Sequence, residues 1–163
     1  MIEAVIFDLD GTLIHLPIDY EELFREFKKI MQVEHIHPLV DAFSKLDKNT
    51  RRQVFRVWDN AELAASAKMT VNEEGVKIYK KFAQKPKALV TLQGRTLVKT
   101  ILAQLGLPFD VIITREDSLN RTEQLKNAAK RLKIQFQSIL FVGNTRNDSL
   151  AAEKVGCQFL RTK

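Results

Sequence analysis

The sequence contains very little cysteine, since Cys157 is the only one among 163 residues. One cysteine excludes a disulfide within the chain and is typical of proteins from a reducing interior. Long apolar runs are also missing, and no stretch approaches the roughly 20 residues that a helix needs to span a bilayer. No charged segment followed by an apolar one marks a secretory signal. We therefore expect a cytoplasmic protein without membrane contacts.

The excess of positive charge is modest. The formal net charge is +6, with 26 Lys and Arg against 20 Asp and Glu, and the basic residues occur in short pairs rather than in a block. Such a charge is compatible with nucleic acid and with small anions alike. No motif that combines aromatic and basic residues supports nucleic-acid binding. We expect a small anionic partner and no nucleic acid.

The order of the apolar segments predicts an α/β fold. Short β-prone runs alternate with amphipathic helices from residue 85 onward, which is typical of βα units and a parallel sheet. The expected strands are 4–7, 87–91, 110–114, 138–142 and 157–160, and helices are expected at 95–105, near 120–132 and at 148–155. We predict a doubly wound, Rossmann-like parallel sheet.

A helical segment interrupts this alternation. Helix patterns fall at 20–33, 38–46, 50–67 and 70–82, although a glycine at position 75 weakens the last one. The simplest organisation is an α/β core of residues 1–14 plus 85–163, with residues 15–84 inserted as a small all-helical domain. Within the insertion, Arg51, Arg52, Arg56 and Trp58 could meet an anionic or aromatic leaving group. A solvated basic face with Trp58 packed inside is the simpler interpretation.

The stretch that follows the first strand is the most informative. The apolar run Ala4 to Phe7 leads directly into Asp8 and Asp10, which project to the same side if extended geometry persists. Two neighbouring carboxylates repel each other, and an all-oxygen pair of this kind suits a hard divalent cation such as magnesium. Gly11 permits a sharp turn, and Thr12 adds a hydroxyl. This pattern predicts a metal or phosphate site at the end of the strand.

Other predicted strands also end in polar residues. In an open α/β sheet, ligands bind beyond the carboxyl ends of the strands. Carboxylates, hydroxyls, amides and glycines at such ends suit a metal and a phosphoryl group. The residues concerned are Thr91 after the second strand, Thr114 to Asp117 after the third, and Gly143, Asn144 and Asp148 after the fourth.

The segment Asp8-Leu9-Asp10-Gly11-Thr12 resembles the first motif of the haloacid dehalogenase (HAD) superfamily of phosphatases and phosphotransferases. A helical insertion just after this motif is similar to the C1-type cap of that superfamily, which selects the substrate. The resemblance therefore covers essentially the whole chain. It implies a magnesium-dependent, HAD-like phosphatase that hydrolyses a small phosphorylated substrate.

The resemblance also implies individual roles. Asp8 would be the nucleophile that accepts the phosphoryl group, and Asp10 the general acid and base. Magnesium would bind the Asp8 carboxylate and the Asp10 carbonyl. Thr91 would hydrogen-bond the phosphoryl group, and the backbone at Leu92 would help to cradle it. The simpler alternative for the two aspartates is a turn without chemistry.

Two later motifs depart from the family pattern. The resemblance implies a lysine near the start of the helix after the third strand, a counter-cation that balances the charges of the phosphoryl group and Asp8. That lysine is absent; Arg121 lies closest to its place and Lys126 is the alternative, unless both are surface cations. In the segment Val142 to Asp148, Asn144 replaces an aspartate that commonly ligates the metal. An amide oxygen holds magnesium less strongly than a carboxylate. Asp148 is expected to serve both as a metal ligand and as a helix cap.

The Asn144 departure keeps other functions open. A HAD-fold protein that binds phosphate or regulates a partner, with weak catalysis, is one alternative. A phosphomutase or another phosphotransferase is a second, because it would use the same phospho-aspartate chemistry. The presence of Asp10 argues against the dehalogenase branch, which resembles this family but lacks that acid.

Overall fold

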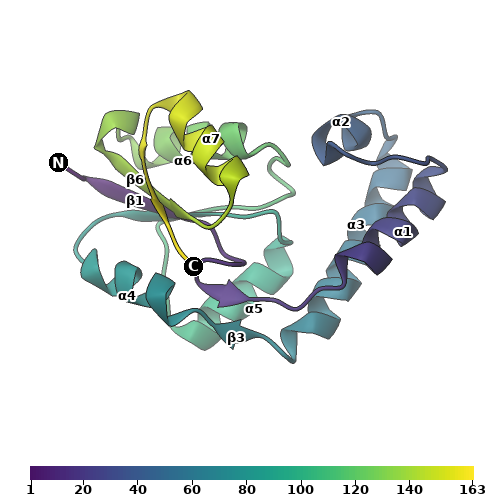
Figure 1. Cartoon of the computed structure of the whole chain (residues 1–163), viewed down its shortest axis with the longest axis horizontal. Coiled ribbons are helices and arrows are strands. Elements are labelled where there is room, and N and C mark those ends of the chain that lie inside the picture. The colour runs from purple at the N-terminus through teal and green to yellow at the C-terminus, as the bar shows by residue number, and fades with distance from the viewer. The chain divides into compact units, whose positions relative to one another are not determined.

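Five parallel strands form the centre of the larger part of the chain (Figure 1). The computed structural model describes all residues from Met1 to Lys163. The strand order is β5-β4-β1-β6-β7, and each neighbouring pair is parallel. The strands are β1 (Ala4–Phe7), β4 (Lys87–Val90), β5 (Val111–Ile113), β6 (Ile139–Gly143) and β7 (Gln158–Arg161). The predicted α/β sheet is confirmed.

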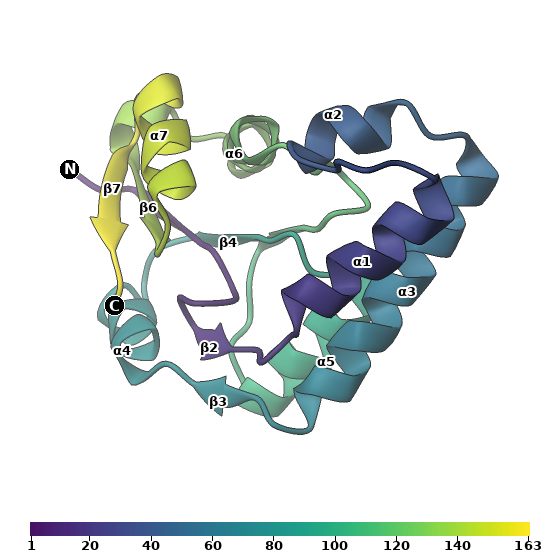
Figure 2. The same ribbon diagram turned by 45° about the vertical axis from the view of Figure 1, so that its right-hand side comes forward.

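Helices cover both faces of this sheet, as a doubly wound fold requires. Figures 1 and 2 show α6 and α7 on one face and α4 and α5 on the other. Their bounds are α4 (Glu73–Lys81), α5 (Arg95–Leu105), α6 (Arg121–Leu132) and α7 (Arg146–Val155), with a short 3-10 helix at Phe136–Ser138. The predicted α6 cap is present, because the Asn120 side chain accepts from the Glu123 N–H (3.0 Å).

Alternation along β1 decides which side chains face which helices. Ala4 and Ile6 belong to the hydrophobic cluster that includes residues of α6 and α7. Phe7 instead packs on the opposite face, where its ring lies 5.8 Å from that of Tyr79 on α4. Side chains of a strand alternate between its two faces. Asp8, the next residue after β1, is therefore directed toward α6 and α7.

The helical part of the chain is shorter than the sequence pattern predicts. Two compact units exist: residues 1–15 with 70–163, and residues 16–69. The expected insertion of 15–84 therefore differs from the structure at its second boundary, since residues 70–84 belong to the core unit. Two strands of two residues each, β2 (Ile14–His15) and β3 (Thr70–Val71), pair antiparallel within that unit. Strands this short leave no periodic pattern in a sequence.

Gly75 explains why α4 packs so closely on the core. A Cβ at this position would lie 1.8 Å from the carbonyl oxygen of Thr12. The glycine that weakens the helix pattern is therefore the residue that lets the α4 backbone approach the loop after β1. This contact ties α4 to the segment that carries Asp10 and Gly11.

The smaller unit consists of α1 (Tyr20–Met31), α2 (Leu39–Ser44) and α3 (Lys48–Ser66). Asp19 caps α1 as predicted, since its carboxylate accepts from the Glu22 N–H (3.1 Å). Trp58 is buried and its ring lies 5.5 Å from Phe27 and 6.3 Å from Phe43. The prediction that Trp58 packs inside the helical segment is confirmed. The basic side chains of Arg51, Arg52 and Arg56 are exposed.

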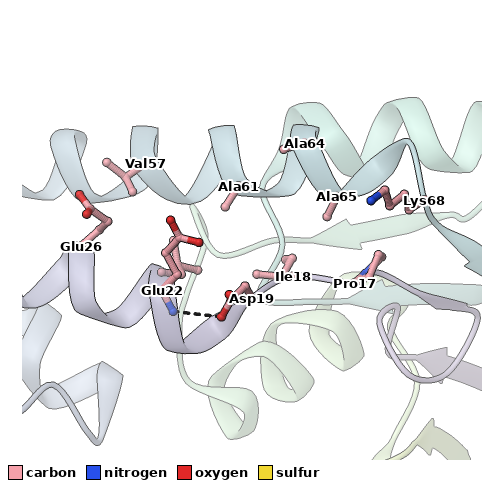
Figure 3. Close-up of a pocket in the computed structure, with 11 residues that line it drawn as sticks. Pro17, Ile18, Asp19, Glu22, Glu26, Val57, Ala61, Ala64, Ala65 and Lys68 are labelled. Carbon is pink, nitrogen blue, oxygen red and sulfur yellow. Dashed lines mark hydrogen bonds between the residues drawn. The ribbon is translucent and has the colours of Figure 1, made fainter.

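Small residues leave a groove of about 400 Å³ between α1 and α3 (Figure 3). Ala61, Ala64 and Ala65 line it from α3, and Glu22 and Glu26 line it from α1.

None of the helices in either unit is both long and apolar enough to cross a membrane.

Candidate active site

Three neighbouring strands end in polar residues at one edge of the sheet. Strands β4, β1 and β6 lie side by side and run parallel. The polar residues that follow each of them therefore meet at this edge. Asp8 is buried there, and its N–H donates to the Val142 carbonyl on β6 (3.0 Å). The sheet thus fixes the Asp8 backbone before any side-chain contact is made.

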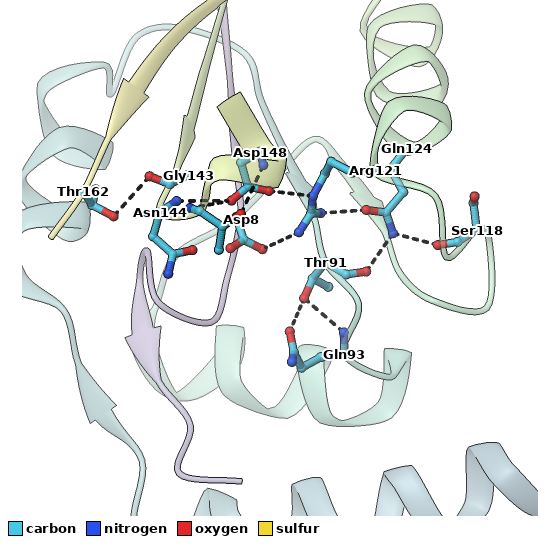
Figure 4. A network of polar contacts seen from close by, with 11 residues as sticks. Asp8, Thr91, Gln93, Ser118, Arg121, Gln124, Gly143, Asn144, Asp148 and Thr162 are labelled. Atoms are coloured by element: carbon cyan, nitrogen blue, oxygen red, sulfur yellow. Dashed lines mark hydrogen bonds and ion pairs between the residues drawn. The ribbon is translucent and has the colours of Figure 1, made fainter. Parts of the chain in front are cut away.

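Arg121, the first residue of α6, connects two buried carboxylates (Figure 4). Its Nη2 donates to Asp8 Oδ1 (3.0 Å), and its Nε donates to Asp148 Oδ1 (2.9 Å). The three side chains are 10%, 7% and 2% exposed. When both carboxylates are ionised, this group of three side chains carries a net negative charge, which attracts a further cation. Arg121, the residue closest to the expected counter-cation position, is the one that reaches Asp8.

Asp148 holds the loop after β6 in place. Its Oδ2 accepts from the N–H groups of Asn144 (3.2 Å) and Thr145 (3.3 Å), and its own N–H donates to Thr145 Oγ1 (3.1 Å). These contacts form a capping box at the start of α7. The predicted cap role is confirmed. Because Arg121 occupies Oδ1 as well, little of this carboxylate is left to bind a metal directly.

The pKa of Asp8 is raised from 3.8 to about 7. Burial is the largest cause, because a carboxylate that leaves water is easier to keep neutral. The Arg121 guanidinium and the Leu9 N–H favour the ionised form, whereas Asp148 and Asp10 disfavour it. The effect of burial exceeds the effects of Arg121 and Leu9, so a further positive charge at this site would favour the ionised form of Asp8.

Gly11 and Asn144 fit closely against each other. Gly11 has a φ of +85°, and a Cβ at this position would lie 2.1 Å from Asn144 Nδ2. Any other residue at position 11 would therefore be strained and would displace the amide. The Gly11 carbonyl accepts from Thr162 Oγ1 (3.2 Å), which also lies 3.3 Å from the Gly143 carbonyl. Thr162 thus joins the loops that carry Asp10 and Asn144.

An oxygen set beside Asp8 could hold a magnesium ion. Asn144 Oδ1 is buried and has no hydrogen-bond partner, as is true of Thr12 Oγ1. Buried oxygens without partners are costly, and a hard cation that prefers oxygen ligands would satisfy the amide oxygen. Figure 4 shows Asn144 next to Asp8. No three His, Cys, Asp or Glu side chains gather as a metal site, so the fit relies on one carboxylate and neutral oxygens.

Thr91 lies at the end of β4 as predicted, but its hydroxyl is engaged within the chain. Thr91 is buried; its Oγ1 hydrogen-bonds Gln93 Oε1 and accepts from the Gln93 N–H (3.1 Å). A phosphoryl group would have to replace the Gln93 side chain as partner. The next peptide is fixed too, because the Leu92 carbonyl accepts from Arg115 Nη1 (3.0 Å).

Lys126 does not join this network. Its side chain is 54% exposed and pairs with Glu123 of the same helix (3.5 Å). Lys126 lines an outer hollow together with Lys130 and Lys133. Of the two candidate counter-cations, the structure therefore brings Arg121 to Asp8 and leaves Lys126 on the surface.

Asp10, two residues beyond Asp8, is partly exposed at the start of the turn. A β-bridge between Asp10 and Ile14 closes this turn. Asp10 lies close enough to raise the pKa of Asp8. The two aspartates therefore lie close together, with Asp8 buried and Asp10 more accessible.

Sequence reasoning missed three side chains of the site, Gln93, Gln124 and Thr162. Gln124 had a detectable signal, because it occupies a buried position in the helical stripe that continues with Leu125 and Ala128. Thr162 follows the short edge strand β7, and Gln93 lies in a loop. Neither position has a periodicity that would mark it.

The sheet order and the buried Asp8–Arg121–Asp148 network define a Rossmann-like α/β protein with its polar site at the strand ends. The chain belongs to the family of haloacid dehalogenase-like hydrolases, whose model matches residues 5–162. This finding agrees with the resemblance that the residues around Asp8 carry.

Known proteins match this chain in sequence over part or most of its length, and solved structures share its fold. Pyrophosphatase PpaX of Bacillus cereus is 28% identical over 175 residues, which covers 95% of this chain and 80% of that protein. A phosphoglycolate phosphatase of Neisseria meningitidis is 35% identical over 77 residues, covering 44% of this chain. A haloacid dehalogenase-like hydrolase structure from Bacteroides fragilis has a TM-score of 0.72 at 18% identity, covering 98% of this chain and 86% of that one.

Some curated matches are partial. The chain spans 33% of the length of the Neisseria phosphatase and 34% of a probable GTP-binding protein EngB of Mycoplasma genitalium, which is 38% identical over 66 residues. The latter match covers 39% of this chain. Membership of the family therefore rests on the family model that matches residues 5–162. The Bacteroides structure, at 18% identity, shows the shared fold.

Proposed function

We propose that this protein is a magnesium-dependent phosphatase that hydrolyses a small phosphate monoester through a phospho-aspartate on Asp8. The observation that carries the proposal is the buried Asp8 carboxylate, held 3.0 Å from Arg121 Nη2 at the end of a central strand. Family membership and relatives named as phosphatases support the reaction class.

In the first half-reaction, an Asp8 carboxylate oxygen attacks phosphorus and forms a new P–O bond. The bond from phosphorus to the substrate oxygen breaks, and protonated Asp10 donates its proton to that leaving oxygen. Arg121 offsets the negative charge on Asp8 and on the transferring group. Thr91 and the backbone at Leu92 would contact the phosphoryl oxygens once Gln93 gives way.

In the second half-reaction, water attacks the phosphorus of phospho-Asp8. Asp10, now ionised, takes a proton from that water, and the bond between phosphorus and the Asp8 oxygen breaks. Inorganic phosphate leaves and Asp8 returns as a carboxylate. The enzyme returns to its starting state, and in sum one water molecule has hydrolysed one phosphate ester bond.

Asp8, the Asp10 carbonyl and Asn144 would hold the magnesium ion, and Asp148 would support it from the loop. When bound, the ion supplies positive charge that favours ionised Asp8 and neutralises phosphoryl oxygens. The orphaned amide oxygen of Asn144 supports this assignment. We also propose that the helical unit of residues 16–69 acts as the substrate-selecting cap that the family resemblance implies.

A phosphate-release screen over a panel of metabolites, with and without magnesium, tests this function. Asp8→Asn is expected to abolish release, because an amide is a poor nucleophile. Asp41→Asn, at an exposed position of α2, is the matched control and is expected to keep full activity. Magnesium-dependent release by Asp8→Asn at the wild-type rate would contradict the mechanism.

A regulatory phosphate-binding protein with slow turnover is the second candidate, and the neutral side chain of Asn144 favours it. Asn144→Asp is expected to restore a charge and to tighten magnesium binding, measured by calorimetry. If that variant binds magnesium no better and turns over no faster, Asn144 does not limit the site. A phosphotransferase would be recognised by phosphate transfer to an added sugar in place of release.

A further inference from the structure

Gln124 is a buried amide one turn beyond Arg121 on α6. Its Nε2 donates to the main-chain carbonyls of Thr91 (2.8 Å) and Ser118 (2.8 Å). Its Oε1 accepts from Arg121 Nη1 (2.6 Å). Figure 4 shows the side chain of Gln124 reaching from α6 toward both Arg121 and Thr91. Every one of these contacts lies inside the core unit.

The chemistry of its neighbours fixes the orientation of this amide. The two carbonyls can only accept hydrogen bonds, and a guanidinium can only donate them. The amide therefore must turn both N–H groups to Thr91 and Ser118 and its oxygen to Arg121. Glutamate has the same shape but would point lone pairs at the two carbonyls. Methionine would offer no donor and only a weakly accepting sulfur.

Arg121 gains a third fixed contact from this arrangement. Its Nε, Nη2 and Nη1 each meet a different acceptor: Asp148, Asp8 and Gln124. Three acceptors around a planar group define both its position and its plane. The third acceptor is neutral, so it orients the cation without adding another negative charge that would compete with a phosphoryl group.

The contact also connects two elements of the site. Thr91 directly follows β4, and its hydroxyl is a proposed phosphoryl contact, whereas Arg121 begins α6. Gln124 binds the Thr91 carbonyl and the Arg121 guanidinium at once, so the counter-cation is held at a fixed distance from the strand end. Ser118 extends this tie to the loop that precedes α6.

We propose that Gln124 is a positioning residue that holds the Arg121 guanidinium at the phosphoryl site beside Asp8. This inference rests on the proposed function for its catalytic consequence. The restraint of Arg121 itself is inferred from its hydrogen bonds and does not depend on the proposed function. Gln124 contacts Arg121 and two main-chain carbonyls, so it would act through Arg121 rather than on the substrate.

The side-chain NMR signals of Arg121, in the protein without substrate or magnesium, test the restraint directly. In the wild type, rotation of the Nη1 group is expected to be slow and its proton signals resolved, because Gln124 and the carboxylates hold the plane. The loss of one set of signals in Arg121→Met assigns them. Fast, averaged signals in the wild type would overturn the proposal without any variant of Gln124.

Variants then separate positioning from folding. Gln124→Met and Gln124→Glu are expected to shift or broaden the Arg121 signals, whereas Gln137→Met, at an exposed glutamine of the 3-10 helix, leaves them unchanged. Unshifted signals in a folded Gln124→Met protein would contradict the proposal. This measurement needs no catalysis, so it tests the restraint of Arg121 even if the protein shows no phosphatase activity.

Kinetic measurements test whether this restraint of Arg121 affects catalysis. Gln124→Met is expected to lower kcat by about 10- to 100-fold, because misplacing a catalytic group by about 1 Å has effects of that order. In an Arg121→Met background the same change is expected to lower kcat less than about twofold, since coupled residues are not additive. An equal fold-loss in both backgrounds would mean that Gln124 acts only on the fold.

Discussion

Replacing Asp8 with asparagine is expected to stabilise the protein in metal-free buffer above neutral pH, although it removes the proposed nucleophile. The pKa of Asp8 is about 7 in the folded protein, against an ordinary value of 3.8, mainly because the carboxylate is buried. The folded state therefore binds a proton that the unfolded state has released, and its stability falls as the pH rises between these values.

The size of this effect follows from the two pKa values. At about 1.4 kcal/mol for each pH unit between them, ionised Asp8 costs the folded state about 4 kcal/mol. Below the unfolded pKa the cost is absent, and above the folded pKa it is complete. Asparagine is neutral at every pH and resembles the protonated carboxyl, so it avoids the cost.

Urea denaturation with a chelator present measures the difference. Near pH 8, Asp8→Asn is expected to raise the free energy of unfolding by about 4 kcal/mol. Near pH 4, the variant and the wild type are expected to have similar free energies of unfolding. Asp41→Asn, at an exposed site, is expected to show no such pH dependence. A variant that is equally or less stable than the wild type at both pH values would refute the argument that burial dominates at Asp8.

Three further changes test other parts of the structure. Gly75→Ala, which stabilises most helices, is expected here to cost about 2 kcal/mol or more in urea denaturation, because its Cβ would lie 1.8 Å from the Thr12 carbonyl; a stabilised variant would disprove the close approach. Trp58→Ala is expected to cost the helical unit about 3–5 kcal/mol, seen by thermal unfolding, and a loss below 1 kcal/mol would contradict its burial. Arg121→Met is expected to lower kcat/KM at least about 100-fold, whereas Lys126→Met changes it less than about twofold; the reverse order would reassign the counter-cation.

The regular elements of the core could be predicted well from the sequence. Residues 95–105 were expected as a helix and form α5 with those bounds, because apolar spacing and the glycine that follows mark both its face and its end. The gathering of polar residues at one edge of the sheet could also be predicted, because the carboxyl ends of neighbouring parallel strands lie together. These features depend on local patterns that each segment contains by itself.

Other features depend on contacts between distant segments, and these the sequence did not reveal. The core keeps residues 70–84 because two-residue strands pair and because α4 lies against Thr12. The choice between Arg121 and Lys126 needed the position of the α6 N-terminus over Asp8. The engagement of the Thr91 hydroxyl by Gln93, and the role of Gln124, depend on side-chain geometry that no spacing rule contains.

The acyl-phosphate on Asp8 is the most direct test of the proposed chemistry. The protein would be mixed with p-nitrophenyl phosphate and magnesium, quenched with acid, treated with borohydride, and analysed by peptide mass spectrometry. We predict a label at Asp8 that accumulates further in Asp10→Asn. The p-nitrophenolate group leaves without a proton from Asp10, whereas the variant cannot activate water in the second half-reaction. Phosphate release at an undiminished rate, with no label at Asp8 in either protein, would contradict the central claim.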